Sequence, residues 1–259
     1  LTISEKQKLR RLLEENYLPK NRVYRYNFFY DNCTTRARDI IEKCIEGKVV
    51  YSEGKERLSF RDIVHQYTKG HEWDELGIDM CLGSEADKPI DTRKQMFAPF
   101  YMLEAAKKAT IVVGDSVRPL ILHEKKVVDV EPEDVREGFP LSHMVCVFIL
   151  IGVTCFVGWL QFKIRKIIWI WDLLLFGVQG LAGCVITFLV FFSTHPTVGS
   201  NWLILLLNHI PLIYLPVMVY RAIKGKKDYY HTINIVCLTS FMMIMPFIQQ
   251  KFNVTVLPL

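Results

Sequence analysis

Four long apolar stretches dominate the second half of the chain. They cover roughly residues 141–162, 167–192, 202–220 and 232–250. A helix needs about 20 predominantly apolar residues to cross a bilayer, and each stretch approaches or exceeds that length. The sequence therefore predicts an all-α membrane domain of four transmembrane helices over residues 139–259, preceded by a water-facing α+β domain over residues 1–138.

The distribution of charge supports this division. Residues 1–139 carry 24 Lys and Arg against 25 Asp and Glu, whereas residues 140–259 carry 8 against 2. The net charge of +5 therefore belongs to the membrane half, where it indicates topology. A nucleic-acid surface would instead gather basic residues on one folded face, so we expect no nucleic-acid partner.

The basic residues of the membrane half lie in two of its loops. One group separates the first two apolar stretches and the other separates the last two. Because Lys and Arg concentrate in cytoplasmic loops, both loops should face the cytoplasm. The loop at residues 193–201 has no Lys or Arg, which places it, the water-facing domain and the C-terminus on the opposite side. The two basic groups are Lys163, Arg165 and Lys166, and Arg221, Lys224, Lys226 and Lys227.

Polar residues within the apolar stretches are functional candidates, because polar groups are costly in hydrocarbon. They are Asp172, Gln179, Asn208 and His209. The alternative is an interfacial Asp172 and hydrogen bonds between helices for the others. The loop at residues 194–201 adds His195 and Asn201, an imidazole and an amide on the side of the water-facing domain. We therefore consider His195, Asn201 and Asn208 a possible membrane-side site.

The seven cysteines form no CxxC pair and have no Cys/His spacing typical of zinc, so we expect neither a disulfide framework nor a metal site. Four of them fall in or at the edge of apolar stretches, where cysteine behaves as a small hydrophobe. Of the remaining three, Cys44 and Cys81 are expected in the core. Only Cys33 stands at a position that suggests chemistry.

Local patterns place Cys33 at the start of a helix. Alternating aromatics at Tyr24, Tyr26 and Phe28 predict a half-buried strand. Asp31 and Asn32 are good N-caps for the helix that follows, which should end at Gly47.

Other helices are expected before Pro19, starting at a Ser4–Gln7 capping box, then from Ser59 to Tyr67, and from Asp91 to Ala109 with an interruption at Pro99. Residues 111–130 suggest short strands with turns.

A cysteine at a helix N-terminus can act as a nucleophile. The unpaired N–H groups and partial positive charge of the helix end stabilise a thiolate, and the same N–H groups can stabilise an oxyanion. Arg36, one turn later, would add positive potential if it faces the thiol. The alternative is a cysteine that only packs at a strand-helix junction.

A catalytic cysteine usually needs a histidine base. His65, His71 and His123 stand in no recognisable catalytic motif, and we expect them to be solvated or structural. His195 could contribute from the membrane domain if the geometry allows.

Two segments carry a resemblance to a known family. Residues 24–39, with the core Asp31-Asn32-Cys33-Thr34-Thr35-Arg36, and the loop His195-Pro196-Thr197-Val198-Gly199-Ser200-Asn201 resemble Lnb. Lnb is the lipoprotein N-acyltransferase of Bacteroidota, located in the inner membrane with a periplasmic domain. The resemblance implies a fold related to circularly permuted papain-like transferases. In that fold the catalytic histidine precedes the cysteine, so we expect the base, and part of the periplasmic domain, upstream of this sequence.

The resemblance also implies a mechanism. Cys33 would take an acyl chain from a phospholipid as a thioester and pass it to the α-amine of a diacylated lipoprotein. The N–H groups from Asn32 to Thr34 would hold the oxyanion, and no cofactor is implied. Phe28, Phe29 and Tyr30 could line the acyl entrance, or could be ordinary core.

Two other functions stay open at this point. A membrane-anchored cysteine peptidase or amidase would share the nucleophile but transfer its acyl group to water. A membrane scaffold or transport component would have an inert Cys33, with Asp172, Asn208 and His209 along a path between the helices.

Overall fold

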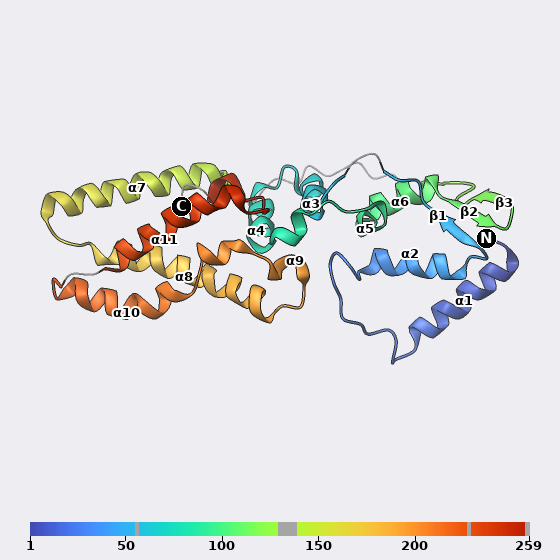
Figure 1. Ribbon diagram of the computed structural model, residues 1–259, viewed down its shortest axis with the longest axis horizontal. Helices are drawn as coiled ribbons and strands as arrows, with labels where there is room; N and C mark the ends of the chain where they lie inside the picture. Colours follow the sequence, from blue (N-terminus) through green and yellow to red (C-terminus); the bar gives the residue numbers. More distant parts are fainter. Residues whose placement is uncertain (55–56, 129–138, 227–228, 257–259) are drawn as a thin grey trace. The chain divides into compact units, whose positions relative to one another are not determined.

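A computed structural model describes residues 1–54, 57–128, 139–226 and 229–256 (Figure 1). Its contacts divide the chain into two compact units, Leu1–Ile63 with Pro89–Val135, and Val64–Lys88 with Arg136–Leu259. The expected boundary at residues 138 and 139 falls at the edge of residues 129–138, outside the described chain, and stays a prediction. Residues 64–88 group with the apolar helices, although their composition resembles that of the water-facing half.

The first unit combines helices with a small antiparallel sheet, which confirms the α+β expectation. The sheet has the order β1-β2-β3, with Val49 opposite Ile111 and Ile111 opposite Arg118. β1, which the sequence did not indicate, follows the turn at Gly47, where φ is +107°. The elements are α1 (Ile3–Tyr17), α2 (Cys33–Cys44), β1 (Lys48–Val50), the start of α3 (Phe60–Thr68), α5 (Thr92–Gln95), α6 (Pro99–Lys108), β2 (Thr110–Val113) and β3 (Ser116–Pro119).

The first helix begins two residues earlier than the sequence predicts. Thr2, not Ser4, is the N-cap: its hydroxyl accepts the N–H of Glu5, and the Glu5 carboxylate accepts the N–H of Thr2. Burial would raise the pKa of Glu5, but the N–H groups of Thr2 and Glu46 and the cation of Arg118 lower it below its ordinary value. Glu5 thus ties α1 to β3 and to the end of α2.

The strand predicted over Tyr24, Tyr26 and Phe28 does not form. The side-chain oxygen of Asn27 accepts the N–H groups of Phe29 and Tyr30, each at 3.2 Å. Asn27 and Asp31 form an isolated bridge instead of a ladder. An asparagine that bonds nearby N–H groups favours a turn over extended pairing, so the segment turns directly into α2.

Four segments of the second unit are long and apolar enough to cross a membrane, as the sequence predicted. They are His143–Ile164, Trp169–Phe192, Pro196–Ile223 and Tyr230–Phe247. Little of their apolar surface is covered by protein, with only 6% of the first span's apolar window buried. Apolar surface of that extent must be covered by lipid or by a partner.

The unit's elements are α4 (Glu72–Cys81), η1 (Ser84–Asp87), α7 (His143–Ile164), α8 (Trp169–Phe192), α9 (Pro196–Gly199), η2 (Trp202–Leu205), α10 (Ile210–Ile223), α11 (Tyr230–Ile244), η3 (Met245–Phe247) and η4 (Val254–Val256).

The third span, predicted as one helix over residues 202–220, is broken into separate helical segments. η2 ends at Leu205, and α10 begins at Ile210 with Pro211 in its first turn. The freed carbonyl of Leu206 accepts a hydrogen bond from the Gln179 amide at 3.0 Å. Non-helical backbone at membrane depth requires such a partner, so Gln179 has a structural role.

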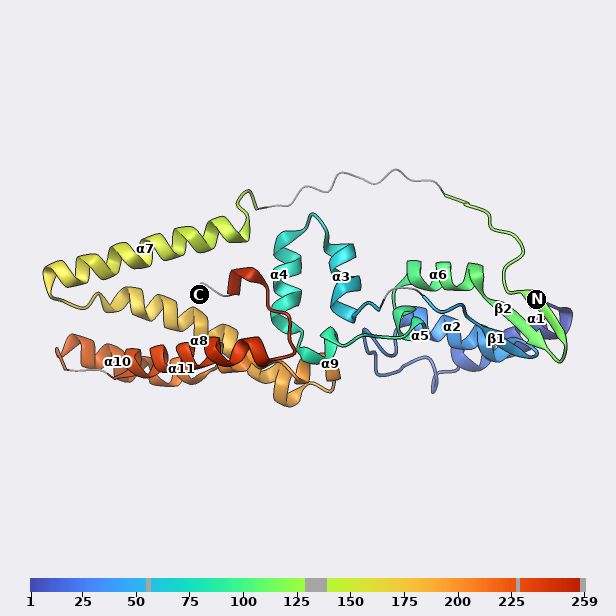
Figure 2. The same ribbon diagram turned by 45° about the horizontal axis from the view of Figure 1, so that its top comes forward.

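The water-facing segment after α4 is bound to the loop that precedes the third span. Gly83 and Ser84 donate backbone N–H groups to the carbonyls of Thr197 and Ser200, at 2.7 and 3.2 Å. η1 and α9 therefore lie in contact. In Figure 2, α4 and the turn that follows it stand beside the ends of the apolar helices, as these bonds require.

Candidate active site

Cys33 is the first residue of α2, as predicted, and its side chain is exposed. Asn32 is the N-cap: its side-chain oxygen accepts the N–H of Thr35 at 2.9 Å, and the Thr35 hydroxyl accepts the N–H of Asn32 at 2.9 Å. This reciprocal capping box fixes the turn on which Cys33 stands.

The side chain of Asn32 also anchors this turn to the rest of the unit. It is 4% exposed, and its amide nitrogen donates to the carbonyls of Phe28 and Phe97, each at 2.9 Å. Phe97 in turn packs against Phe29 and Phe60, with ring centroids 5.1 and 5.3 Å away. The buried Asn32 amide therefore holds the turn that carries Cys33 against an aromatic core.

The capping box changes which backbone groups can hold an oxyanion. The N–H of Asn32, included in the expectation, is already bonded to Thr35 and cannot serve. The N–H groups of Cys33 and Thr34 make no hydrogen bond to another residue in the described part of the chain. These two N–H groups, at the positive end of the helix, are the available donors.

Arg36 does not supply the free positive charge considered from the sequence. Its guanidinium binds both carboxylate oxygens of Asp31, at 2.7 and 2.9 Å, and lies 3.4 Å over the ring of Tyr24. The hydrogen bonds that Arg36 donates to Asp31 raise the pKa of Arg36. Because the Asp31 carboxylate neutralises the charge of the guanidinium, the role of Arg36 is to hold the segment before α2 in place.

Tyr26 is a neighbour of Cys33 that the sequence did not single out as a candidate. Partial burial raises the pKa of its hydroxyl, and the nearby Cys33 and Tyr24 raise it further. The aromatic run suggested only packing, so no signal in the sequence distinguished Tyr26 from Phe28 or Tyr30.

No histidine in the described part of the first unit is hydrogen-bonded to Cys33. The unit contains a single histidine, His123, which is exposed. The Cys33 sulfur lies 4.0 Å from the Thr34 hydroxyl. The described residues of this unit thus present an exposed thiol and, beside it, two backbone N–H groups that make no hydrogen bond to another described residue.

The three residues of the possible membrane-side site belong to the second unit. Asn201 is 3% exposed, and its amide donates to Met80 O at 2.7 Å while its oxygen accepts from Leu203 and Gln250. Asn208 accepts the N–H of Ile210 at the start of α10. The His195 ring lies 3.4 Å from the Ser193 hydroxyl, and its backbone carbonyl accepts the N–H groups of Val198 and Gly199. Asn201 and Asn208 therefore have structural roles, and a role of the trio in one site stays a prediction.

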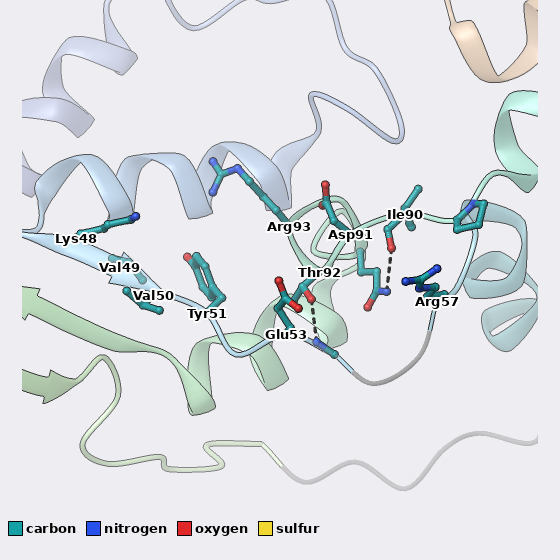
Figure 3. Close-up of a pocket in the computed structure, with 13 residues that line it drawn as sticks. Lys48, Val49, Val50, Tyr51, Glu53, Arg57, Ile90, Asp91, Thr92 and Arg93 are labelled. Carbon is teal, nitrogen blue, oxygen red and sulfur yellow. Dashed lines mark hydrogen bonds between the residues drawn. The ribbon is translucent and has the colours of Figure 1, made fainter.

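A hollow of about 570 Å³ in the first unit is lined by β1, the residues that follow it and the start of α5 (Figure 3). Charged side chains line much of it, and Cys33 is not among its lining residues. The charged residues are Lys48, Glu53, Arg57, Asp91 and Arg93. Such a lining does not suit an acyl chain, so the hollow does not identify the reaction site.

The fold and the cysteine turn together define a class: a multi-pass membrane protein whose α+β domain presents an exposed cysteine at a helix N-terminus. Two family models match the chain, the Lnb N-terminal periplasmic domain over residues 1–69 and the Lnb transmembrane domain over residues 134–259. The chain belongs to the Lnb family. Nothing matches among the curated proteins or among the solved structures.

Proposed function

We propose that this protein is a lipoprotein N-acyltransferase in which Cys33 carries the acyl group. One observation supports this most directly: the thiol is exposed at the first residue of α2, beside two backbone N–H groups that make no hydrogen bond within the described chain. A nucleophile next to preorganised oxyanion donors is the arrangement that acyl transfer requires. Family membership supplies the membrane setting and the periplasmic domain.

The first half-reaction moves an acyl chain from a phospholipid to the protein. The Cys33 sulfur attacks the ester carbonyl, and the resulting oxyanion accepts hydrogen bonds from the N–H groups of Cys33 and Thr34. When the tetrahedral intermediate collapses, the ester C–O bond breaks. The glycerol oxygen leaves with the proton that the thiol gave up, as a lysophospholipid, and a thioester remains on Cys33.

The second half-reaction moves the chain to a diacylated lipoprotein. The free α-amine of its lipidated N-terminal cysteine attacks the thioester, the C–N bond forms, and the C–S bond breaks. The amine proton returns to the Cys33 sulfur, which restores the enzyme. Both steps pass through the same oxyanion position, so the same two N–H groups serve twice.

The membrane helices fit this chemistry. Donor and acceptor are both lipids, and withdrawing an acyl chain from a bilayer costs about 0.8 kcal/mol per CH₂. An enzyme embedded in the bacterial inner membrane, with its catalytic domain on the periplasmic side, can meet both reacting groups near the membrane surface without extracting either lipid.

Intact mass spectrometry tests the proposal. The purified protein and its Cys33→Ser form are incubated with phospholipid and then with a diacylated lipopeptide. We expect a hydroxylamine-labile acyl adduct on the unaltered protein, absent from Cys33→Ser, that moves to the lipopeptide amine. Cys44→Ser is the matched control, because that thiol is buried and its pKa is raised by burial.

The other outcomes distinguish the alternatives. Full lipopeptide acylation by Cys33→Ser would show that Cys33 is not the nucleophile. An adduct that discharges to water in the presence of the lipopeptide would indicate a hydrolase.

A further inference from the structure

The segment that joins α1 to α2 exposes aromatic side chains directly before Cys33. Figures 1 and 2 show this segment as a long loop. Tyr26, Phe28 and Tyr30 are 47%, 50% and 37% exposed, whereas Phe29 is 5% exposed and packs into the aromatic core. Of the residues considered for an acyl entrance, Phe29 therefore belongs to the core. Phe28 and Tyr30 form an exposed aromatic rim together with Tyr26.

The aromatic rim adjoins the helix end that carries the exposed thiol. The guanidinium of Arg36 lies 3.4 Å over the ring of Tyr24, and the ring centroids of Tyr24 and Tyr26 are 6.2 Å apart. Arg36 follows Cys33 by three residues, so these two side chains share one face of α2. The carbonyl of Phe28 accepts a hydrogen bond from the N-cap side chain of α2 at 2.9 Å. The exposed rings and the exposed thiol therefore lie at the same end of α2.

The same segment carries only positive charge. Residues 18–30 contain three basic residues and no Asp or Glu, although residues 1–139 are almost neutral as a whole. The three basic side chains are exposed, and none of them forms an ion pair with a carboxylate in the described part of the chain. They are Lys20, Arg22 and Arg25. The segment thus combines exposed rings with unpaired cations.

A phospholipid bilayer supplies a partner for both kinds of group. Its headgroup region takes up amphipathic aromatic rings, and its phosphates attract Lys and Arg. The exposed thiol favours a bilayer over a protein partner, because the ester carbonyls that it would attack lie just beneath the headgroups. This last step rests on the proposed function, whereas the rings and the charges do not.

We propose that residues 20–30 dock on the periplasmic surface of the phospholipid bilayer. The rings of the aromatic rim enter the headgroup region, and Lys20, Arg22 and Arg25 contact lipid phosphates. Docking brings the Cys33 thiol to the level of the ester carbonyls. The segment is therefore a positioning surface for the acyl donor.

Fluorescence quenching in the full-length protein tests the docking. The protein is placed in nanodiscs of phosphatidylglycerol and phosphatidylcholine, and an environment-sensitive fluorophore is attached to Val23→Cys in a Cys33→Ser parent. Val23 is 79% exposed and lies among the three basic residues, so the label removes neither a ring nor a cation. Lipids that carry a nitroxide on the headgroup should quench this label strongly. The parent, treated in the same way, gives the background of the remaining cysteines.

Val117→Cys is the matched control in the same unit. Val117 is exposed on β3, which Glu5 ties to the C-terminal end of α2. The 12 residues of α2 separate its two ends by about 18 Å. The label at position 117 should therefore keep its emission.

A second comparison tests the charges. Arg22→Gln combined with Arg25→Gln should weaken docking about fivefold for each residue, the usual contribution of one basic residue near an anionic membrane. Quenching of the label at position 23 should fall accordingly. Lys43→Gln combined with Lys48→Gln makes the same change of charge near the other end of α2, where both lysines are exposed, and should leave the quenching unchanged.

The results separate docking from acyl transfer. Equal emission from the labels at positions 23 and 117 would overturn the docking and leave the segment to a protein partner. Equal loss of quenching in the two charge pairs would overturn the phosphate contacts. Every variant in these measurements lacks the Cys33 thiol, so a failure of the acyl-adduct test would not change their outcome.

Discussion

At the scale of single residues, Asn32 does two separable jobs. Its side-chain oxygen caps α2 through the N–H of Thr35, and its amide nitrogen satisfies the carbonyls of Phe28 and Phe97. The first job is local and could be served by any short polar side chain. The second needs an N–H donor of this length at this position. An asparagine is therefore required here to hold the turn of Cys33 against the aromatic core.

Substitution of Asn32 by Ser and by Ala should separate the two jobs. Asn32→Ser keeps a capping oxygen but leaves two carbonyls without their donor, which should cost about 1–3 kcal/mol. Asn32→Ala also loses the cap, for a further loss of about 1 kcal/mol. Apparent melting temperatures in detergent should therefore fall in the order unaltered, Ser, Ala. The rate of thioester formation at Cys33 should fall in both variants.

Asn21→Ser is the control for that series, because the Asn21 side chain makes an exposed hydrogen bond to Glu15 and should have little effect. A Ser form as stable as the unaltered protein would show that the cap alone matters.

At the scale of elements, the pairing of η1 with the α9 loop depends on the absence of a side chain at Gly83. A Cβ there would lie 2.5 Å from the carbonyl carbon of Ser200 and 2.6 Å from the nitrogen of Asn201. Both are backbone atoms, which cannot rotate away. The same loop holds the buried Asn201 amide against Met80, so a shift would disturb several hydrogen bonds together.

Gly83→Ala should therefore destabilise the second unit by about 1–3 kcal/mol, the usual cost of overpacking. Gly77→Ala makes a matched control within the same segment, because nothing lies within 4 Å of its added Cβ. Alanine is favoured over glycine inside a helix by about 1 kcal/mol, so that change in α4 should be neutral or stabilising. Thermal unfolding of both variants in one detergent measures the difference, and equal melting temperatures would contradict the close contact.

At the scale of the whole molecule, the distribution of basic residues predicts the orientation in the membrane. Thr194 and Lys166 are both exposed and lie in loops at opposite ends of α8. Thr194→Cys, in a Cys33→Ser background, should react with a membrane-impermeant maleimide in cells whose outer membrane is permeable to it. Lys166→Cys should react only after the inner membrane is opened.

The Cys33→Ser parent sets the background of that labelling experiment. Labelling of Lys166→Cys in cells with an intact inner membrane would contradict the proposed topology.

Several features of the protein follow from the sequence alone, because they depend on neighbours along the chain. The four spans follow from the length of their apolar runs, although the break after Leu205 does not. Cys33 falls at a helix N-terminus because Asn32 and Thr35 form a capping box within four residues. The same local reasoning wrongly predicted a strand at residues 24–28, where the hydrogen bonds to the Asn27 side chain form a turn instead.

Tertiary structure decided the features that join distant residues. It grouped residues 64–88 with the apolar helices, paired Arg36 with Asp31, and brought Asn253 to Asp79. It also brought His65 to Asp79, which lie on different helices and meet through the turn at Gly70. Local propensity fixes where an element starts, whereas the path of the folded chain decides which side chains meet.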